Sequence, residues 1–159
     1  MKSVLFKLSL LIPVLFFLSC DKDCPDFNFT AEPIQLAADI QIIEDYLSAN
    51  GLTAEKTESG LHYIINEQGE GGNPCTDSRV TVAYKGYLTN GQVFDENADG
   101  ITFGLQQVIP GWTEGIPLFK KGGSGVLLIP SGMAYGTAGR APSIPPNTVL
   151  IFDVNLISF

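Results

Sequence analysis

Residues 108–115 read Val-Ile-Pro-Gly-Trp-Thr-Glu-Gly and carry much of the information about the fold. A short helix is predicted from Trp112 to Phe119, between strands. By composition alone this stretch is a core segment with a turn, because an isolated Trp is more often a core residue than a platform for a ligand. Two similar stretches follow, Ala134-Tyr135-Gly136 and Ile144-Pro145-Pro146-Asn147. Their order along the chain is more informative than any one of them.

The sequence around these stretches alternates apolar and polar side chains, which is typical of β-strands. Strands are predicted at residues 60–65, 80–84, 126–129 and 149–159, with a hairpin turn at Asn90-Gly91. The 17 glycines and 10 prolines supply many tight turns. The sequence therefore predicts a mainly β domain.

The composition is that of a globular chain and excludes a nucleic-acid binder. The 159 residues are 45% hydrophobic and 16% charged, enough for one domain with a core and a short extra segment. The formal net charge is -8, and the nine Lys and Arg form no basic run. Because nucleic acid requires a basic patch to neutralise its phosphates, we expect no nucleic-acid partner.

Residues 1–19 are predicted to be a signal peptide that is removed. An apolar run extends from Leu8 to Leu18 behind two lysines. This run is shorter than the ~20 residues that span a bilayer, and it fits the core of an export signal. Ser9 is the one polar residue of the run. A buried helix of the fold is the alternative.

The end of this run, Phe17-Leu18-Ser19-Cys20, resembles the lipobox of bacterial lipoproteins, whose cysteine becomes the lipidated first residue. We expect lipid at Cys20 and a tether over residues 20–31. The predicted location is the cell envelope, with the protein held at the outer membrane through its N-terminal lipid, on the periplasmic or surface side.

Residues 33–50 have the pattern of a helix, within a segment of helix and connector at 32–58. Leu36, Ile40, Ile43 and Leu47 form one apolar stripe, Pro33 suits the first turn, and Gly51 suits the position past the end. We expect this helix to dock on the β domain of a monomer. A dimerisation helix is the alternative.

No acid–base, metal or phosphate site is evident. His62 is predicted to be a surface residue of a strand, because it alternates with Leu61 and Tyr63. The cysteines match no zinc motif, and Gly122-Gly123-Ser124-Gly125 lacks the Lys of a phosphate loop. We expect neither a metal nor another cofactor.

Two cysteines remain if Cys20 carries lipid. Cys24 and Cys75 are then the only pair in an oxidising compartment, so we expect a disulfide between them. Two free thiols are the alternative.

Seven motifs in order resemble the FKBP family of peptidyl-prolyl cis-trans isomerases. They are Tyr84-x-Gly86, Gly91-x-Val93-Phe94-Asp95, Val108-Ile109-x-Gly111-Trp112-x-Glu114-Gly115, Ile129-Pro130, Ala134-Tyr135-Gly136, Ile144-Pro145-Pro146 and Leu150-Ile151-Phe152-Asp153-Val154. The resemblance covers about residues 60–159 and is tightest from Val80 onward. It implies an α+β fold in which a strongly bent antiparallel sheet wraps around one short helix, here as a domain over 59–159 with an extra N-terminal helix.

The resemblance also implies a set of site residues. Those in the catalytic role would be Tyr84, Asp95, Trp112, Tyr135 and Phe152. Those that bind substrate would be Phe94, Phe103, Val108, Ile109 and Ile144. Trp112 would form the floor, Tyr135 and the Ile109 N–H would hold substrate carbonyls, and Ile144 would cover the proline ring.

Three departures from the family pattern lie at the rim. Ile101 stands where an aromatic is frequent, Arg140 where a histidine is common, and Ser143 where an aliphatic is common. No Arg occurs between Asp95 and Ile101, so we expect Asp95 to lack an arginine partner. These changes bear on the binding of macrolide inhibitors more than on activity.

The resemblance implies a prolyl isomerase that acts on proline-containing polypeptides and assists the folding of exported envelope or surface proteins. The alternative is a non-catalytic module of the same fold that binds extended proline-containing segments of a partner.

Overall fold

The computed structural model describes residues 24–30 and 32–159. The predicted signal peptide and the Cys20 lipidation site lie outside these residues. The main elements, in chain order, are α1 (Pro33–Ala49), β1 (Glu55–Lys56), β2 (His62–Glu67), β3 (Arg79–Leu88), β4 (Val93–Gly104), α2 (Pro110–Gly115), β5 (Ser124–Ile129) and β6 (Leu150–Ser158). Short 3-10 turns are η1 (Leu105–Gln107), η2 (Ile116–Leu118) and η3 (Ser131–Met133).

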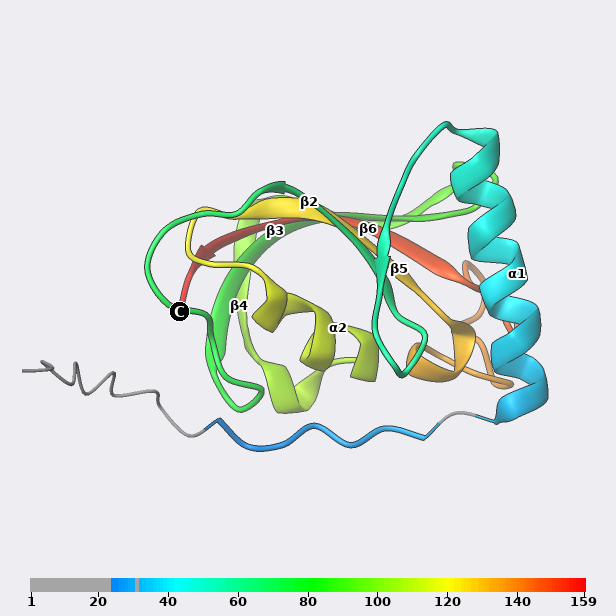
Figure 1. Ribbon diagram of the computed structural model, residues 1–159, viewed down its shortest axis with the longest axis horizontal. Helices are drawn as coiled ribbons and strands as arrows, with labels where there is room; N and C mark the ends of the chain where they lie inside the picture. Colours follow the sequence, from blue (N-terminus) through cyan, green and yellow to red (C-terminus); the bar gives the residue numbers. More distant parts are fainter. Residues whose placement is uncertain (1–23, 31) are drawn as a thin grey trace, which may run out of the picture.

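The six strands form one antiparallel sheet in the order β1-β2-β5-β6-β3-β4. The sheet curves over α2, which lies against its concave side (Figure 1). Shifts in register along β3, between Val82 and Tyr84 and between Gly86 and Tyr87, mark the irregular pairing with β4. Such bulges bend a strand and increase its twist. The predicted bent sheet around one short helix is confirmed.

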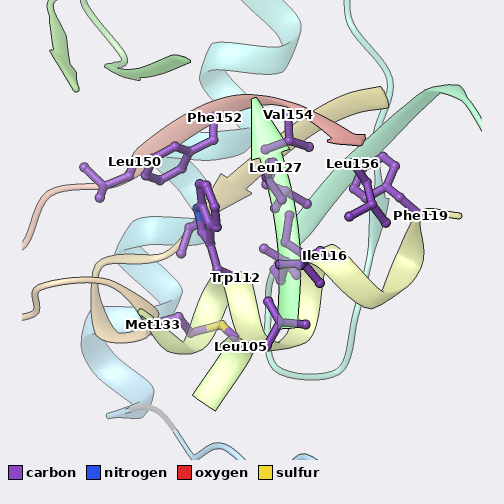
Figure 2. Packing of buried hydrophobic residues seen from close by; sticks show 14 of the residues in the cluster. Leu105, Trp112, Ile116, Phe119, Leu127, Met133, Leu150, Phe152, Val154 and Leu156 are labelled. Carbon is purple, nitrogen blue, oxygen red and sulfur yellow. The ribbon is translucent and has the colours of Figure 1, made fainter. Parts of the chain in front are cut away.

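The main core lies between the concave side and α2. Figure 2 shows Trp112 and Ile116 of the helical segment directed toward Leu127, Phe152 and other side chains of the sheet. Ile116 and Leu127 are fully buried. Burial of an aliphatic side chain of this size stabilises the fold by roughly 1.5–3 kcal/mol. The stretch 108–115 thus contributes Trp112 to the main core.

Helix α1 docks on the opposite side of the sheet, as predicted. Ile43 and Leu47 are buried there with Leu128, Val149 and Ile151. The helix begins at Pro33, and Gly51 follows its end with a φ of 64°. A positive φ is readily adopted by glycine, which explains the stop signal. None of the helices in the described part of the chain is long and apolar enough to cross a membrane.

The prediction that His62 is a surface residue is wrong. Its side chain is only 4% exposed, and Nδ1 lies 2.9 Å from the Gly60 carbonyl oxygen. His62 pairs with Leu128, which lies under α1, so the second face of the strand is covered. Burial lowers the pKa of His62, and the hydrogen bond to Gly60 opposes this effect.

The described part of the predicted tether, residues 24–30, lies along the domain below α2 in Figure 1. Cys24 and Cys75 form a disulfide with Cα atoms 5.1 Å apart. The Thr76 hydroxyl donates to the Pro25 carbonyl at 3.0 Å, and Phe27 and Phe29 pack on the main core. These contacts hold the segment on the domain surface.

Candidate functional site

A cavity of about 410 Å³ opens between α2 and the sheet. Its lining comes from β3, β4, η1, α2, β6, the short loop before α2 and the loop that follows β5. The lining residues are Tyr84, Phe94, Asp95, Ile101, Phe103, Gln107, Val108, Ile109, Trp112, Tyr135 and Phe152. The structure thus brings together the side chains of all the predicted site residues except Ile144.

Trp112 lies at the centre of an aromatic cluster. Its ring centroid is 5.1 Å from that of Tyr84 and 5.2 Å from that of Phe152, with the ring planes nearly perpendicular in both pairs. Phe103 lies 5.1 Å away on another side. Edge-to-face pairs of this kind add about 0.5–1.5 kcal/mol beyond the area they bury. The cluster makes a rigid apolar floor and wall.

Trp112 also carries an unsatisfied group. Its ring is 5% exposed, and its Nε1 is, among the described residues, the buried side-chain polar atom without a hydrogen-bond partner. A buried donor without an acceptor is costly and uncommon. Such a donor beside an open cavity is suited to a ligand that supplies an acceptor or an electron-rich face.

Pro110 and Thr113 fix the position of Trp112. Pro110 opens α2, where its fixed φ is favourable, and the Ile109 carbonyl accepts the Trp112 N–H at 2.9 Å. The Thr113 hydroxyl donates to the Leu105 carbonyl at 2.6 Å and joins the helix to η1. Val108 and Ile109 therefore meet the cavity at the start of a well-anchored helix.

Gly86 makes room for the opposite aromatic wall. A Cβ atom at this position would lie 2.7 Å from the Phe94 ring and 2.8 Å from the Phe152 ring. Those two rings pack edge to face with centroids 5.4 Å apart. A side chain at position 86 would displace them, so the glycine of the Tyr84-x-Gly86 motif is needed for the wall itself.

The polar side of the cavity differs from our expectation, because Asp95 does have an arginine partner. Arg140 Nη1 lies 3.8 Å from Asp95 Oδ2, and the Arg140 guanidinium lies 5.8 Å from the centre of the Tyr135 ring. Arg140 reaches Asp95 from another loop, which is why the sequence between Asp95 and Ile101 gave no sign of the pair. Burial, followed by the hydrogen bond to Asp95, raises the pKa of Tyr84 to about 12.

Tyr135 is presented by the loop that follows β5. The Ser131 carbonyl accepts the N–H groups of Ala134 at 3.0 Å and of Gly136 at 2.8 Å, one on each side of Tyr135. The Asn147 N–H donates to the Gly136 carbonyl at 2.8 Å. Backbone hydrogen bonds therefore set the direction of the tyrosine.

Ile144 does not line the cavity, although it was predicted to bind substrate. Its side chain is 3% exposed and belongs to the main core. Its backbone exchanges two hydrogen bonds with Arg140, at 2.7 and 2.9 Å, so it supports the loop that carries the rim arginine. Gln107 lines the cavity without having been predicted, because a polar residue in a short turn has the appearance of a solvated one.

The arrangement offers shape and apolar surface rather than acid–base groups. Asp95 is the one carboxylate in the lining. Within residues 24–30 and 32–159, no group of three His, Cys, Asp or Glu side chains is placed to hold a metal ion. A polypeptide with a compact apolar ring is the kind of ligand that fits such a pocket.

Residues 71–157 match the family model described as FKBP-type peptidyl-prolyl cis-trans isomerase. A probable isomerase of this type from Neisseria meningitidis, FkpA, is 51% identical over 104 residues, which are 64% of this chain and 38% of that protein. FkpA from Aeromonas hydrophila is 46% identical over 120 residues, covering 72% and 44%. The chain therefore spans less than half the length of these relatives.

Two solved structures are similar. The crystal structure of FkpA from Escherichia coli has a TM-score of 0.68 and 40% identity, and the alignment covers 79% of this chain and 59% of that one. A peptidyl-prolyl cis-trans isomerase from Pseudomonas syringae has a TM-score of 0.69 and 30% identity, covering 82% and 97%.

Proposed function

This chain belongs to the FKBP-type peptidyl-prolyl cis-trans isomerases, and on that premise we propose that its pocket catalyses the cis–trans interconversion of Xaa-Pro bonds in polypeptides. The observation that supports this proposal most directly is the aromatic cluster around Trp112, which surrounds a cavity large enough for a proline ring and its neighbours.

The reaction needs no proton transfer. Amide resonance sets a barrier of ~18–20 kcal/mol to rotation, and the C–N bond loses double-bond character as it twists. An apolar pocket disfavours the planar, dipolar amide relative to the twisted one. A site that holds the twisted geometry binds the transition state more tightly than the ground state. A pocket with one carboxylate and several aromatic rings suits this chemistry.

We assign roles to five groups of the pocket. Trp112 is the floor against which the proline ring packs. The Tyr135 hydroxyl and the Ile109 N–H hold substrate carbonyls, so that the chain on one side of the bond is fixed while the other turns. Asp95, with its arginine partner, keeps the polar side of the pocket in place. Tyr84 stays protonated and joins this polar side to the aromatic wall.

The substrates we propose are exported polypeptides of the cell envelope or surface. This proposal draws on the export signal at residues 1–19 and the lipobox that ends at Cys20. A lipid at Cys20 would place a monomer at the outer membrane, with residues 59–159 as its isomerase domain. Membrane fractionation of wild type and Cys20→Ala tests the anchor, since the variant should lose the lipid mass and the membrane association.

A non-catalytic module that binds extended proline-containing segments is the second candidate. Two residues of the rim favour this candidate. Ile101 stands where the family frequently has an aromatic residue, and Arg140 stands where a histidine is common. Under this alternative a proline peptide would bind in the pocket without faster isomerisation.

The deciding experiment is isomerisation of a short peptide with an apolar residue before proline. The chain from residue 20, with Cys20→Ser, should accelerate the exchange between cis and trans forms seen by NMR. Trp112→Phe serves as the pocket variant and should reduce the acceleration. A folded wild-type chain that binds the peptide but leaves its exchange at the uncatalysed rate would favour the binding module.

A further inference from the structure

We propose that α1 is part of the catalytic unit, and that Asp39 in this helix is a positioning residue for Tyr135. The inference rests on the proposed isomerase function. Asp39 acts through Ser131 on residues 130–136, which we call the Tyr135 loop. In Figure 1 the orange segment that includes η3 lies beside α1.

The Asp39 carboxylate is fully buried. Its Oδ2 accepts the Ser131 N–H at 2.8 Å and the Ser131 hydroxyl at 2.6 Å. Its Oδ1 accepts the Gln35 amide N–H at 2.7 Å. In the described part of the chain no lysine or arginine pairs with this carboxylate. Three neutral donors therefore satisfy a buried charge.

Ser131 transmits this contact to the pocket. It is itself fully buried and begins η3. Its carbonyl accepts the N–H groups of Ala134 and Gly136, which flank Tyr135 in the sequence. One residue thus gives both its donors to α1 and its acceptor to the turn that presents Tyr135. A shift of Ser131 would move both hydrogen bonds that direct the tyrosine.

Docking of the helix alone does not explain Asp39. Ile43, one turn further along α1, and Leu47 already anchor the helix through apolar contacts. An apolar side chain at position 39 would continue that stripe, whereas a buried carboxylate has a desolvation cost that its hydrogen bonds must offset. The hydrogen bonds made by Asp39 to another element go to Ser131. What the carboxylate adds is a fixed position for the Tyr135 loop.

If Asp39 positions Tyr135, the functional unit begins at α1 and not at residue 59. The proposed isomerase domain begins at residue 59, after α1, so it would contain Tyr135 and Ser131 without Asp39. A domain of that extent would contain all the pocket residues that the family shares. It would lack Asp39, which supports Tyr135. We infer that α1 is a working part of this enzyme rather than a spacer.

The test compares Asp39→Ala with Asp39→Asn in the chain from residue 20 carrying Cys20→Ser. Both kcat and KM of a proline peptide are measured. Asp39→Ala should lower kcat by about two- to tenfold, up to the loss expected from one hydrogen bond at Tyr135, with KM changed little. Asp39→Asn retains an acceptor for Ser131 and should restore most of kcat.

Leu47→Ala is the matched control for helix docking. It weakens the packing of α1 away from the Tyr135 loop, so it should reduce stability while leaving kcat within about twofold of wild type at a temperature where the variant is folded. Ser131→Ala is a milder second variant, because it removes one of the two donors that Ser131 offers to Asp39 and keeps the other. It should lower kcat less than Asp39→Ala, and urea unfolding shows which variants are folded.

A double-mutant cycle separates positioning from general damage. In a Tyr135→Phe background, Asp39→Ala should change kcat less than twofold, because the hydroxyl that it positions is absent. Equal losses in both backgrounds would overturn the inference, as would equal effects of Asp39→Ala and Leu47→Ala on kcat. A folded wild type without isomerase activity would overturn the proposed function as well, so the two failures are distinct.

Discussion

The Arg140 guanidinium lies 3.8 Å from the Asp95 carboxylate at the side of the pocket. Asp95 belongs to β4 and Arg140 to the loop between η3 and β6, and both side chains are about half exposed. The arginine also lies over the Tyr135 ring. It therefore joins two of the residues to which we assign roles, on either side of the pocket mouth.

Removal of this arginine should have a small, salt-dependent effect on catalysis. Exposed ion pairs contribute about 0.2–1 kcal/mol, so Arg140→Ala should lower kcat/KM by at most about fivefold. The difference from wild type should shrink as salt is raised. Lys85→Ala is the control, since it removes the same charge from β3 outside the cavity lining. A loss that is equal in both variants would contradict a local role for Arg140.

Replacement of the pocket floor should have a larger effect. Trp112→Ala should destabilise the fold by about 3–5 kcal/mol, because it truncates a buried aromatic side chain. Trp112→Phe should remain folded and still lose several-fold in kcat/KM. Phe119→Leu alters a fully buried aromatic outside the cavity lining and should keep its activity. Circular dichroism and peptide isomerisation are measured on the same samples. Comparable activity losses in Trp112→Phe and Phe119→Leu would contradict the role of Trp112 as the pocket floor.

The activity should be nearly independent of pH from 6 to 9. The pKa of Tyr84 is raised to about 12, so its phenol stays protonated throughout this range. The reaction itself requires no proton transfer. Measurement of kcat/KM with a neutral peptide checks this expectation, and a bell-shaped profile centred between pH 6 and 8 would indicate a titrating group that we have not identified.

The stability, in contrast, should respond to His62. Burial lowers its pKa below 6.5 in the folded chain, so the unfolded chain takes up a proton more readily. The contribution of neutral His62 is complete above pH 6.5 and is lost as the pH falls toward the folded pKa. Wild type should therefore lose more stability than His62→Gln between pH 7 and 5, as measured by urea midpoints. Parallel curves for the two proteins would refute this assignment.

The disulfide should contribute strongly to stability. Cys24 and Cys75 are separated by 51 residues. In the chain-entropy relation a loop of this length corresponds to about 4 kcal/mol. Reduction should therefore lower the urea midpoint of wild type and leave that of a Cys24→Ser, Cys75→Ser double variant unchanged. Two thiols that react with an alkylating reagent in unreduced, unfolded protein would show that the bond is absent.

The sequence predicted those parts of the fold that local patterns control. Four of the six strands, β2, β3, β5 and β6, were predicted from their apolar patterns, and α1 was predicted from its apolar stripe between Pro33 and Gly51. The strands β1 and β4 were not predicted. The pocket side chains followed from the order of motifs, in which Tyr84, Trp112 and Phe152 keep near-family spacing. The first two signals depend on residues close to one another in the chain, whereas the pocket residues depend on the resemblance to a family.

The features that the sequence did not predict depend on tertiary contacts between distant elements. His62 was predicted to be a surface residue because alternation assumes that one face of the strand is exposed to solvent. In the structure α1 covers that face. Asp39 was not predicted as a site residue, because its role depends on Ser131, which is 92 residues away in the sequence. Arg140 was counted only as a departure, because its pairing with Asp95 depends on the path of a distant loop. Tertiary contacts of this kind leave no local mark on the sequence.

With the proposed lipid at Cys20, the bond between Cys24 and Cys75 would also limit the reach of the pocket. With lipid at Cys20, only residues 21–23 lie between the anchor and the first residue that is covalently tied to the folded body. An extended chain spans at most ~3.3–3.6 Å per residue, so these four steps reach about 14 Å. The body would stay close to the bilayer and would meet polypeptide segments near the membrane surface. Reduction of the bond would lengthen the chain between the anchor and the folded domain. The pocket could then reach substrates farther from the membrane.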